Sequence, residues 1–550
     1  MTKTTTTILV LLALVTSALV APAEAQRRRG RNEAERADTD AENTEVVEKE
    51  PMVERDRQGP EVVALPSTDS PLVAIRLLFK VGSMHDPKGK EGLASLTGLM
   101  LSQSGTAHRS YAEAVDKLYP MAASINVTTD REVTVISGEV HRETLDEYLG
   151  LLLEGLLEPG FKEEDLTRHK AQLNAYLTNT LRASNDELLG LEALQQLIFA
   201  DHPYGHAPQG TVEGLAGITL DDVRTFYSTF YYPSNLMLGL AGGFSEGLAE
   251  ELTTKLAALP EGGMADGRVD HDLPSPRAID AEGDAETDVS DSGRRFVLID
   301  KPTDSVGIHF GYALPINRSH ADYYPLMVAN SFLGEHRTFH GRLMKQLRGK
   351  RGLNYGDYSY IEYWHFPPFT SNPGPNVPRR QQYFSVWIRP VVPNTAHFAL
   401  RNALYEVDRL IDMGMTQDEF ELTRDFVVNY SKLWAQSPAN RLGFEMDSLY
   451  YRMDSYIGQI DERLKELTLE EVNDAIRRHL RTNNFHAVFV TANAEQVKSY
   501  LEEDKPSPMN YNARPEDEVM RADKTIEKIE VRPQSIEIVS VQDMFQGEGK

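Results

Sequence analysis

Apolar and polar residues follow one another along the chain in patterns typical of strands and helices. Residues 61–65 and 72–81 are rich in Val, Ile, Leu and Phe, and a turn containing Pro and Ser separates them, which predicts a β-hairpin. The segments that follow have the longer period of helices or the apolar character of strands. They predict helices over 92–102, 111–118, 143–157, 163–180 and 221–230, and strands over 127–136 and 236–241.

The second half of the chain repeats this order. Residues 296–299 and 306–314 flank a Thr-Asp-Ser turn, as the first two predicted strands do. Two helix starts also recur, residues 161–166 as 415–420 and residues 219–223 as 468–472. Three matches in the same order indicate that one α+β unit has been duplicated. We therefore predict an α+β fold made of two homologous repeats of a mixed α/β unit.

The first 25 residues have the pattern of a secretory signal peptide. Lys3 precedes a largely apolar stretch over 8–20, and small residues at Ala23 and Ala25 suit cleavage after Ala25. A retained membrane anchor is the weaker alternative, because so short a helix does not cross about 30 Å of hydrocarbon. We expect an exported protein, located in the periplasm or secreted, without stable membrane insertion.

Charge divides the remaining chain into segments. Residues 26–58 are charged and nearly free of aromatic residues, which predicts a disordered linker. Residues 261–293 are strongly acidic and predict an extended linker between the repeats. Residues 536–541 alternate in part and predict a terminal strand. The first repeat is then expected at 59–260, the second at 294–504 and a C-terminal extension at 505–550.

Composition excludes several classes of function. The chain has 57 Lys and Arg against 83 Asp and Glu, a formal net charge of -26, which disfavours binding to nucleic acid. It contains no Cys, which excludes disulfides, thiol catalysis and zinc sites built from Cys. Hydrophobic residues make up 41% and charged residues 25%, as in ordinary globular proteins.

A set of short motifs runs through residues 61–502. The motifs lie at residues 82–100, 105–106, 109–110, 126–129, 201–205, 232–235 and 347–355. In content and order they resemble the pitrilysin/insulinase family of zinc peptidases, which includes the mitochondrial processing peptidases. The resemblance implies α+β repeats, each an antiparallel sheet packed with helices, in a clam-like arrangement that encloses peptides in a chamber.

The zinc motif of that family is degenerate in this chain. Active members carry His-x-x-Glu-His on a helix, where the two His bind zinc and the Glu takes a proton from the zinc-bound water. At the matching positions stand Ser95, Gly98 and Leu99, and the third ligand, a Glu in the family, falls on Ala175 or Tyr176. No imidazole or carboxylate stands at these positions. The resemblance therefore implies no metal and no catalytic residue on this chain alone, with zinc in a partner subunit.

Three other residues match positions at which the family contacts its substrate. Arg348 and Tyr355 match an Arg and a Tyr that stabilise the charge developing on the attacked carbonyl, and both side chains are strong donors. On residue type alone, Arg348 also suits a helix end and Tyr355 an aromatic strand. Asn126 matches a residue on an edge strand that pairs with the substrate as an added strand.

Two further features have more ordinary interpretations. His336 and His340 are four residues apart, but no potential base lies between them, so a loop is favoured over a metal site. Prolines between residues 365 and 380 predict a stiff surface excursion rather than the lining of a chamber.

The resemblance implies a non-catalytic, substrate-binding subunit of an exported heterodimeric zinc peptidase. The partner would be a homologous chain that holds zinc, and this chain would bind unfolded peptides and donate Arg348 and Tyr355 to the partner's site. The alternatives are a zinc-free peptide-binding or scaffold protein and, less favoured, an autonomous metallopeptidase with unrecognised ligands.

Overall fold

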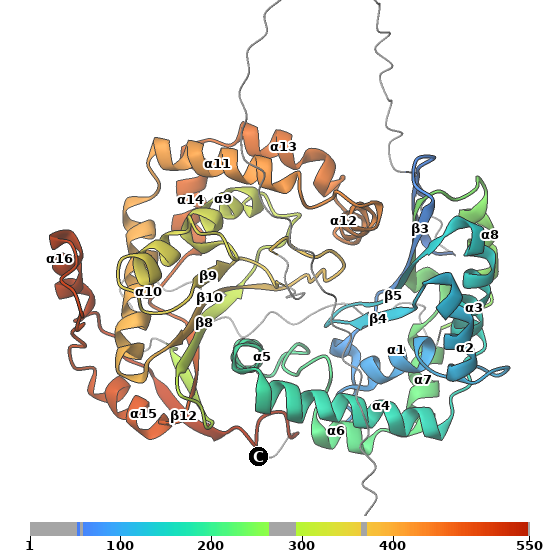
Figure 1. The fold of residues 1–550 in the computed structure, drawn as a ribbon, viewed down its shortest axis with the longest axis horizontal. Helices are drawn as coiled ribbons and strands as arrows, with labels where there is room; N and C mark the ends of the chain where they lie inside the picture. The colour runs from blue at the N-terminus through green and yellow to red at the C-terminus, as the bar shows by residue number, and fades with distance from the viewer. Residues whose placement is uncertain (1–51, 55–58, 263–292, 365–370, 548–550) are drawn as a thin grey trace, which may run out of the picture. The chain divides into compact units, whose positions relative to one another are not determined.

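The computed structural model shows two repeats of mixed strands and helices (Figure 1). It describes residues 52–54, 59–262, 293–364 and 371–547. The expected signal peptide and nearly all of the acidic linker lie outside the described residues. One short strand, β1 (Met52–Glu54), falls within the expected linker 26–58 and pairs antiparallel with β2, so the prediction of disorder is wrong for those three residues.

The first repeat contains a six-stranded mixed sheet in the order β1-β2-β6-β3-β5-β4. Its other strands are β2 (Glu61–Pro66), β3 (Leu72–Phe79), β4 (Asn126–Thr129), β5 (Thr134–His141) and β6 (Leu236–Gly242). β3 is antiparallel to both neighbours, with Ile75 opposite Gly138 of β5 and Leu240 of β6.

Two strand predictions for this repeat are wrong. β2 and β3 do not form a hairpin, because the fully buried β6 lies between them, parallel to β2 and antiparallel to β3. The single strand predicted over 127–136 is the hairpin of β4 and β5, turned by the polar residues at 130–132. Both errors concern which strands are neighbours, since the segments themselves are extended.

The second repeat has a six-stranded sheet of matching order, β12-β7-β11-β8-β10-β9, except that β12 is parallel to β7 whereas β1 is antiparallel to β2. The strands are β7 (Arg295–Asp300), β8 (Val306–Leu314), β9 (Asp357–Tyr360), β10 (Gln382–Val391), β11 (His486–Thr491) and β12 (Ser535–Ser540). Ile308 of β8 lies opposite Ile388 of β10 and Phe489 of β11, as Ile75 lies between its two neighbours in the first repeat. The predicted duplication is confirmed, and so is the terminal strand, which is β12.

The helices also correspond between the repeats. Thr219 and Thr468 each cap a helix by accepting from a backbone N–H three residues later, and an acidic side chain returns the bond, which explains the recurring helix starts. The first repeat has α1 (Leu93–Ser102), α2 (Tyr111–Leu118), α3 (Leu145–Leu157), α4 (Glu163–Ala175), α5 (Asp186–Ile198), α6 (Val212–Gly217), α7 (Leu220–Phe230) and α8 (Leu248–Leu256). The second has α9 (Tyr323–Gly334), α10 (Ala396–Met413), α11 (Gln417–Ser431), α12 (Pro438–Tyr450), α13 (Tyr456–Glu466), α14 (Leu469–His479), α15 (Ala494–Glu503) and α16 (Asp517–Ile526). None of the described helices is long and apolar enough to cross a membrane.

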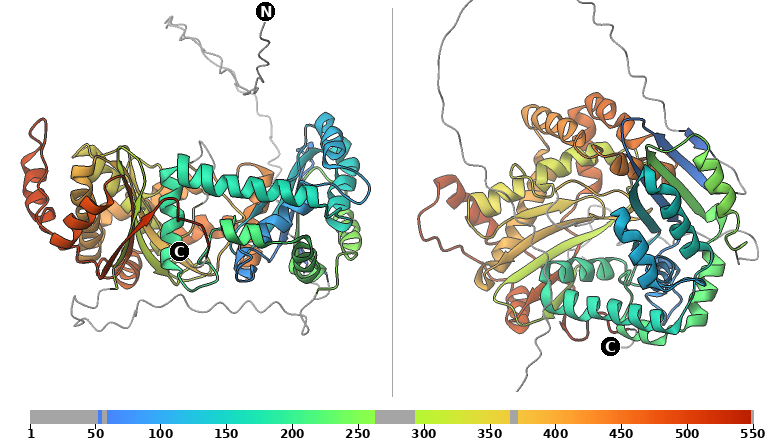
Figure 2. Two further views of the ribbon diagram at one scale, coloured as in Figure 1. Left: turned by 90° about the horizontal axis from the view of Figure 1, so that it is seen from below. Right: turned by 45° about the vertical axis from the view of Figure 1, so that its right-hand side comes forward.

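Each repeat lends one helix to the sheet of the other. α5 packs on β8 and β11 of the second sheet, and α12 packs on β2, β3 and β6 of the first (Figure 2). The approach is close enough to require glycine: a Cβ at Gly190 of α5 would lie 2.4 Å from the His309 ring, and one at Gly239 of β6 would lie 2.4 Å from Met446 Sδ. This exchange buries the second face of each sheet and ties the two repeats together.

The C-terminal residues make a further connection, which we call the C-terminal strap (residues 535–547). β12 pairs parallel with β7 of the second repeat. Beyond it, Met544 and Phe545 are buried in the apolar core of the first repeat. Arg182 Nε donates to the Met544 carbonyl at 2.6 Å, and the Val212 N–H donates to the Phe545 carbonyl at 2.9 Å. The strap therefore belongs structurally to both repeats.

Candidate functional site

The degenerate zinc motif lies on α1, and the structure uses its positions for packing. Ser95, Gly98 and Leu99 are all buried. Ser95 Oγ donates to the Pro208 carbonyl at 2.5 Å, and Leu99 belongs to the apolar core. A Cβ at Gly98 would lie 3.0 Å from Val127 Cγ2 on β4, so the position of the family's catalytic Glu is filled by the neighbouring strand.

The third-ligand positions lie at the junction of two helical segments. Ala175 ends α4, and Tyr176 begins a π-helical segment, Tyr176–Ser184. Burial raises the pKa of Tyr176, and the carboxylate of Glu192 adds to the effect, so the phenol stays protonated. A neutral phenol, a leucine, a glycine and an engaged serine hydroxyl do not fit a zinc site. In the part of the chain that the structure describes, no group of three or more His, Asp or Glu is placed to hold a metal.

Beside these residues is a cavity of about 170 Å³, which we call the inter-repeat cavity. Residues of both repeats line this cavity. Most of them belong to β4, the π-helical segment Tyr176–Ser184 and α5, and two come from the second repeat. The lining residues are Thr128, Thr129, Asp130, Tyr176, Leu181, Leu188, Leu191, Glu192, Gln195, Pro208, Gln209, Tyr363 and Val377.

A buried ion pair between the repeats lies next to this cavity, which its acidic member, Asp130, lines. Arg379 is fully buried, and its Nε and Nη2 donate to the two carboxylate oxygens of Asp130, each at 2.7 Å. Burial by itself would raise the pKa of Asp130, but the guanidinium holds it below the ordinary value. The guanidinium lies 3.5 Å from the centre of the Tyr363 ring and also donates to Gln195 Oε1 at 2.7 Å. The next residue, Arg380, pairs with Glu132 at 2.6 Å.

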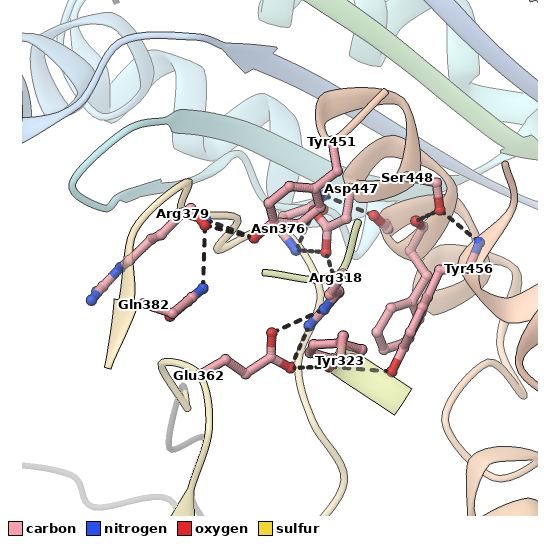
Figure 3. Close-up of polar contacts among 12 residues, drawn as sticks. Arg318, Tyr323, Glu362, Asn376, Arg379, Gln382, Asp447, Ser448, Tyr451 and Tyr456 are labelled. Atoms are coloured by element: carbon pink, nitrogen blue, oxygen red, sulfur yellow. Dashed lines mark hydrogen bonds and ion pairs between the residues drawn. The ribbon is translucent and has the colours of Figure 1, made fainter. Parts of the chain in front are cut away.

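A second polar network holds the Pro-rich loop in place (Figure 3). Arg318 is buried between Glu362, at 3.1 Å, and Asp447, at 3.2 Å. Asp447 accepts from the backbone and the side-chain amide of Asn376 in the loop. Residues 376–379 are thus inside the protein, and the prediction of a surface excursion is wrong for them because their polar groups meet buried partners. Residues 371–375 and 380 are half-buried, and residues 365–370 lie outside the described residues.

The structure brings Arg348 and Tyr355 together on the surface. Arg348 lies in a second π-helical segment, Met344–Gly349, and its guanidinium is 5.4 Å from the Tyr355 ring and 5.5 Å from the Phe339 ring. Tyr355 is 77% exposed and Phe339 67%. Neither Arg348 nor Tyr355 lines the inter-repeat cavity.

Asn126 begins β4, the outermost strand of the first sheet. Its side chain is exposed and donates to Ser124 Oγ at 2.9 Å. β5 is the only strand among the described ones that pairs with β4. The predicted edge strand is confirmed, and a role in binding substrate stays a prediction.

His336 and His340 do not share a helix face, because the chain turns at 335–340. His336 is buried, its Nδ1 lies 2.7 Å from the Tyr360 hydroxyl, and burial lowers its pKa to about 3.

Sequence reasoning missed the ion pairs of Asp130 and Arg379. The alternating charges at 130–132 and the Arg pair after the prolines were their signal, but nothing local links positions so far apart.

Two models of known families match the chain. One, described as insulinase (peptidase family M16), matches residues 62–208, and the other, described as peptidase M16 inactive domain, matches residues 217–426. The chain belongs to peptidase family M16. The family model over the first repeat thus covers the helix with the degenerate motif, and the inactive-domain model covers the surface pair of Arg348 and Tyr355.

Relatives in family M16 include proteins named as peptidases and as non-peptidases. The non-peptidase homolog YmxG of Helicobacter pylori is 26% identical over 423 residues, which are 76% of this chain and 89% of that protein. The uncharacterized zinc protease YmxG of Bacillus subtilis is 24% identical over 288 residues, 52% of this chain and 64% of that protein.

Solved structures with this fold include family M16 members. A peptidase M16 inactive domain from Pseudomonas fluorescens has a TM-score of 0.67 and 23% identity, covering 80% of this chain and 97% of that one. A protease from Helicobacter pylori has a TM-score of 0.66 and 18% identity, covering 80% and 100%. The matches to an inactive domain and a non-peptidase homologue support a non-catalytic family member, and they fit a chain without a catalytic zinc of its own.

Proposed function

We propose that this chain is the substrate-binding, non-catalytic subunit of an exported two-chain zinc peptidase. It binds unfolded peptides, and it presents Arg348 and Tyr355 to the zinc site of a homologous partner chain that carries the intact motif. The observation that carries the proposal is the pair of a half-buried Arg348 and an exposed Tyr355, on a chain whose own motif positions are buried and engaged in packing.

The surroundings of Arg348 suit a role toward another molecule. No carboxylate of the described residues forms an ion pair with Arg348, whose guanidinium instead lies against the exposed rings of Tyr355 and Phe339. Stacking on aromatic rings orients the planar guanidinium while leaving its N–H donors available. A guanidinium and a phenol side by side can both donate to a carbonyl oxygen on which negative charge develops.

Peptide binding rests on the outer edge of β4. An extended peptide can add to this edge through main-chain hydrogen bonds, which makes the recognition tolerant of sequence. Asn126 and Thr128 are exposed on the strand, so no buried side chain has to move first. Export is part of the proposal because residues 1–25 have the pattern of a signal peptide.

The test is reconstitution with a homologous exported chain that carries His-x-x-Glu-His. Arg348→Ala is expected to lower the kcat of the pair for an unstructured peptide by about 10²- to 10³-fold, the usual loss for one such donor. Arg409→Ala is the matched control, because Arg409 is also partly buried and stacked on a tyrosine, with its guanidinium 5.7 Å from the Tyr405 ring. Unchanged cleavage by the Arg348 variant would contradict the donor role.

Metal analysis of the isolated chain tests the second part of the proposal, that this chain holds no zinc and is inactive without a partner. The mature chain is expected to purify without stoichiometric zinc and to leave peptides intact. Stoichiometric zinc together with peptide cleavage that a chelator abolishes would make the chain an autonomous metallopeptidase. Peptide binding without any activity in the reconstituted pair would favour the scaffold alternative.

A further inference from the structure

The segment that carries Arg348 is attached on its inner side to the C-terminal extension. Arg348 lies in the π-helical segment Met344–Gly349, and Arg351 comes two residues after the end of that segment. The side chain of Arg351 is buried, and its Nε donates to Asp523 Oδ1 of α16 at 2.9 Å. Its Nη1 turns back to the segment and donates to the carbonyl and to Oε1 of Gln346, at 2.8 and 3.1 Å. Arg351 therefore links the segment to α16.

Asp523 is itself held in place by its surroundings. Its second carboxylate oxygen, Oδ2, accepts from the Tyr511 hydroxyl at 2.5 Å. Val519 and Ile526, spaced to share the helix face of Asp523, are also buried, and Ile526 belongs to the core of the second repeat. α10 packs against both α16 and the π-helical segment. The Asp523 carboxylate is therefore a fixed point for the Arg351 guanidinium.

The burial of this ion pair makes its geometry matter. A buried guanidinium that loses its carboxylate is an uncompensated charge, which is strongly unfavourable. Because Arg351 is bonded to Gln346, a residue of the same segment as Arg348, its rearrangement shifts the segment as well. A displacement of about 1 Å in a catalytic group can cost about 100-fold in rate.

A second link between the segment and α16 is weaker. Lys350 Nζ pairs with Glu516 Oε2 at 2.5 Å, but the two side chains are 43% and 67% exposed. Solvent screens such a surface pair, so it contributes little. The buried pair of Arg351 and Asp523 is therefore the contact that can hold the segment in one position.

We propose that Asp523 is a positioning residue for the two donors, Arg348 and Tyr355. It acts through Arg351, which lies between the two donors in the sequence, so a shift of the backbone at Arg351 moves both. The proposal rests on the proposed donor function and adds the part of the chain that controls it, α16 of the C-terminal extension. The donors then depend on residues more than 150 positions away in the sequence.

Three variants test this role. Asp523→Asn keeps the shape of the side chain and removes its charge. Asp517→Asn is the matched control, because Asp517 also lies on α16 and pairs with Arg514 at 2.8 Å, but both of these side chains are mostly exposed. Tyr511→Phe is a milder variant that removes one hydrogen bond to Asp523 and keeps the ion pair, and it serves if Asp523→Asn does not fold. Thermal unfolding shows which variants are folded.

The first experiment uses the isolated mature chain and does not depend on any activity. The chain contains no Cys, so Lys345→Cys, at an exposed position of the π-helical segment, takes a nitroxide spin label at one site only. Asp523→Asn is expected to narrow the electron paramagnetic resonance lines of the label, because the segment becomes more mobile. Tyr511→Phe should narrow them less, and Asp517→Asn should leave them unchanged. Unchanged lines in a folded Asp523→Asn variant would overturn the proposal.

The second experiment measures peptide cleavage by the pair reconstituted with the chain that carries His-x-x-Glu-His. Asp523→Asn should lower kcat by about 10- to 100-fold and leave KM within about twofold, because the donors act on the transition state. Asp517→Asn should change neither. In a chain that already carries Arg348→Ala and Tyr355→Phe, Asp523→Asn should lower kcat by no more than about twofold, because residues that act through one another are not additive.

The outcomes separate this inference from the function on which it rests. If Arg348→Ala lowers kcat and Asp523→Asn does not, the positioning role is wrong and the donor function stands. An equal loss from Asp523→Asn with and without the two donors would also overturn the positioning role, because Asp523 would then act elsewhere. If Arg348→Ala leaves cleavage unchanged, the donor function itself fails, a result that does not involve Asp523.

Discussion

β4 and β9 occupy the same outermost place in the two sheets, yet their surroundings are opposite. β4 alternates exposed and half-buried residues, and none of the described strands covers its outer edge. All four residues of β9 are buried, in a cluster that includes Tyr358, Tyr360 and the nearby Trp364 and Trp387. The two strands therefore hold the same place in duplicated sheets, and of the two it is β9 whose side chains lie in a buried aromatic cluster.

The comparison shows how two copies of one sheet come to present different outermost strands. An open strand edge is usually a liability, because it invites pairing with other chains, and short length and polar residues limit the hazard. β4 has four residues, three of them polar, and the close approach of α1 at Gly98 supports it from behind. β9 is also outermost, but all four of its side chains are buried, so a substitution on β9 disturbs the core whereas one at an exposed position of β4 does not.

The largest effect is expected from removing the ion pair that anchors the end of β4. Arg379→Leu leaves the buried carboxylate of Asp130 without its partner, so we expect the free energy of unfolding to fall by about 3–5 kcal/mol. Arg389→Leu is the matched control, since Arg389 also pairs with a carboxylate of the first repeat, Glu187 at 2.8 Å, but both side chains are about one-third exposed. Its loss should cost less than about 1 kcal/mol. Urea denaturation measures both, and equal effects would contradict the anchoring role.

The next effect compares the two edges directly. Tyr360→Ala removes a buried ring and the hydroxyl that meets His336, and we expect it to lower the free energy of unfolding by about 3–4 kcal/mol. Thr128→Ala at the open edge should change it by no more than about 0.5 kcal/mol. The midpoints of urea denaturation at unchanged slope provide the measurement. A large loss at Thr128 would show that the β4 edge is covered.

The smallest expected effect is a pH dependence of the free energy of unfolding that comes from Asp357 of β9. Asp357 of β9 is fully buried, its Oδ2 has no partner among the described residues, and burial raises its pKa to about 8. An unfolded Asp titrates near 3.9, so between pH 4 and 8 the folded chain keeps a proton that the unfolded chain releases. The raised pKa of Asp357 therefore makes the free energy of unfolding depend on pH. The free energy of unfolding is unaffected by this group below about pH 4, and it decreases as the pH rises toward 8, by up to about 1.4 kcal/mol per pH unit.

Replacing Asp357 tests whether the free energy of unfolding decreases with pH because of this carboxyl group. Asp357→Asn cannot ionise, so it should be more stable than the unchanged chain at pH 8, and its stability should fall less between pH 5 and 8. Chemical denaturation at a series of pH values gives the two curves. Asp425→Asn on the surface of α11 is the control and should follow the unchanged chain. Parallel curves for the Asp357 variant and the unchanged chain would exclude a protonated Asp357.

Local patterns predicted five helices of the first repeat, missed α5, α6 and α8, and predicted the sheet neighbours poorly. The helix predicted over 111–118 is α2, because periodicity and the Ser110 cap are properties of adjacent residues. The order of strands depends on pairing between distant segments, and β6 enters between β2 and β3 from far along the chain. The degenerate motif was also visible locally, since its positions lie within one helix.

The rest of the site depends on long-range contacts. Arg379 meets Asp130 across the two repeats, and the inter-repeat cavity combines α5 with Tyr363 and Val377. No spacing rule connects such positions, because their proximity follows from the exchange of α5 and α12 between the sheets. The buried part of the Pro-rich loop was mistaken for a surface segment for the same reason.

The C-terminal strap has a consequence for biosynthesis. Met544 and Phe545 fill part of the core of the first repeat, and β12 completes the sheet of the second. Domains usually fold from the N-terminus onward while the ribosome is still adding residues. Here neither repeat has all its parts until residues 535–547 have emerged from the ribosome, so each waits for a segment that is synthesised long after the rest of the repeat.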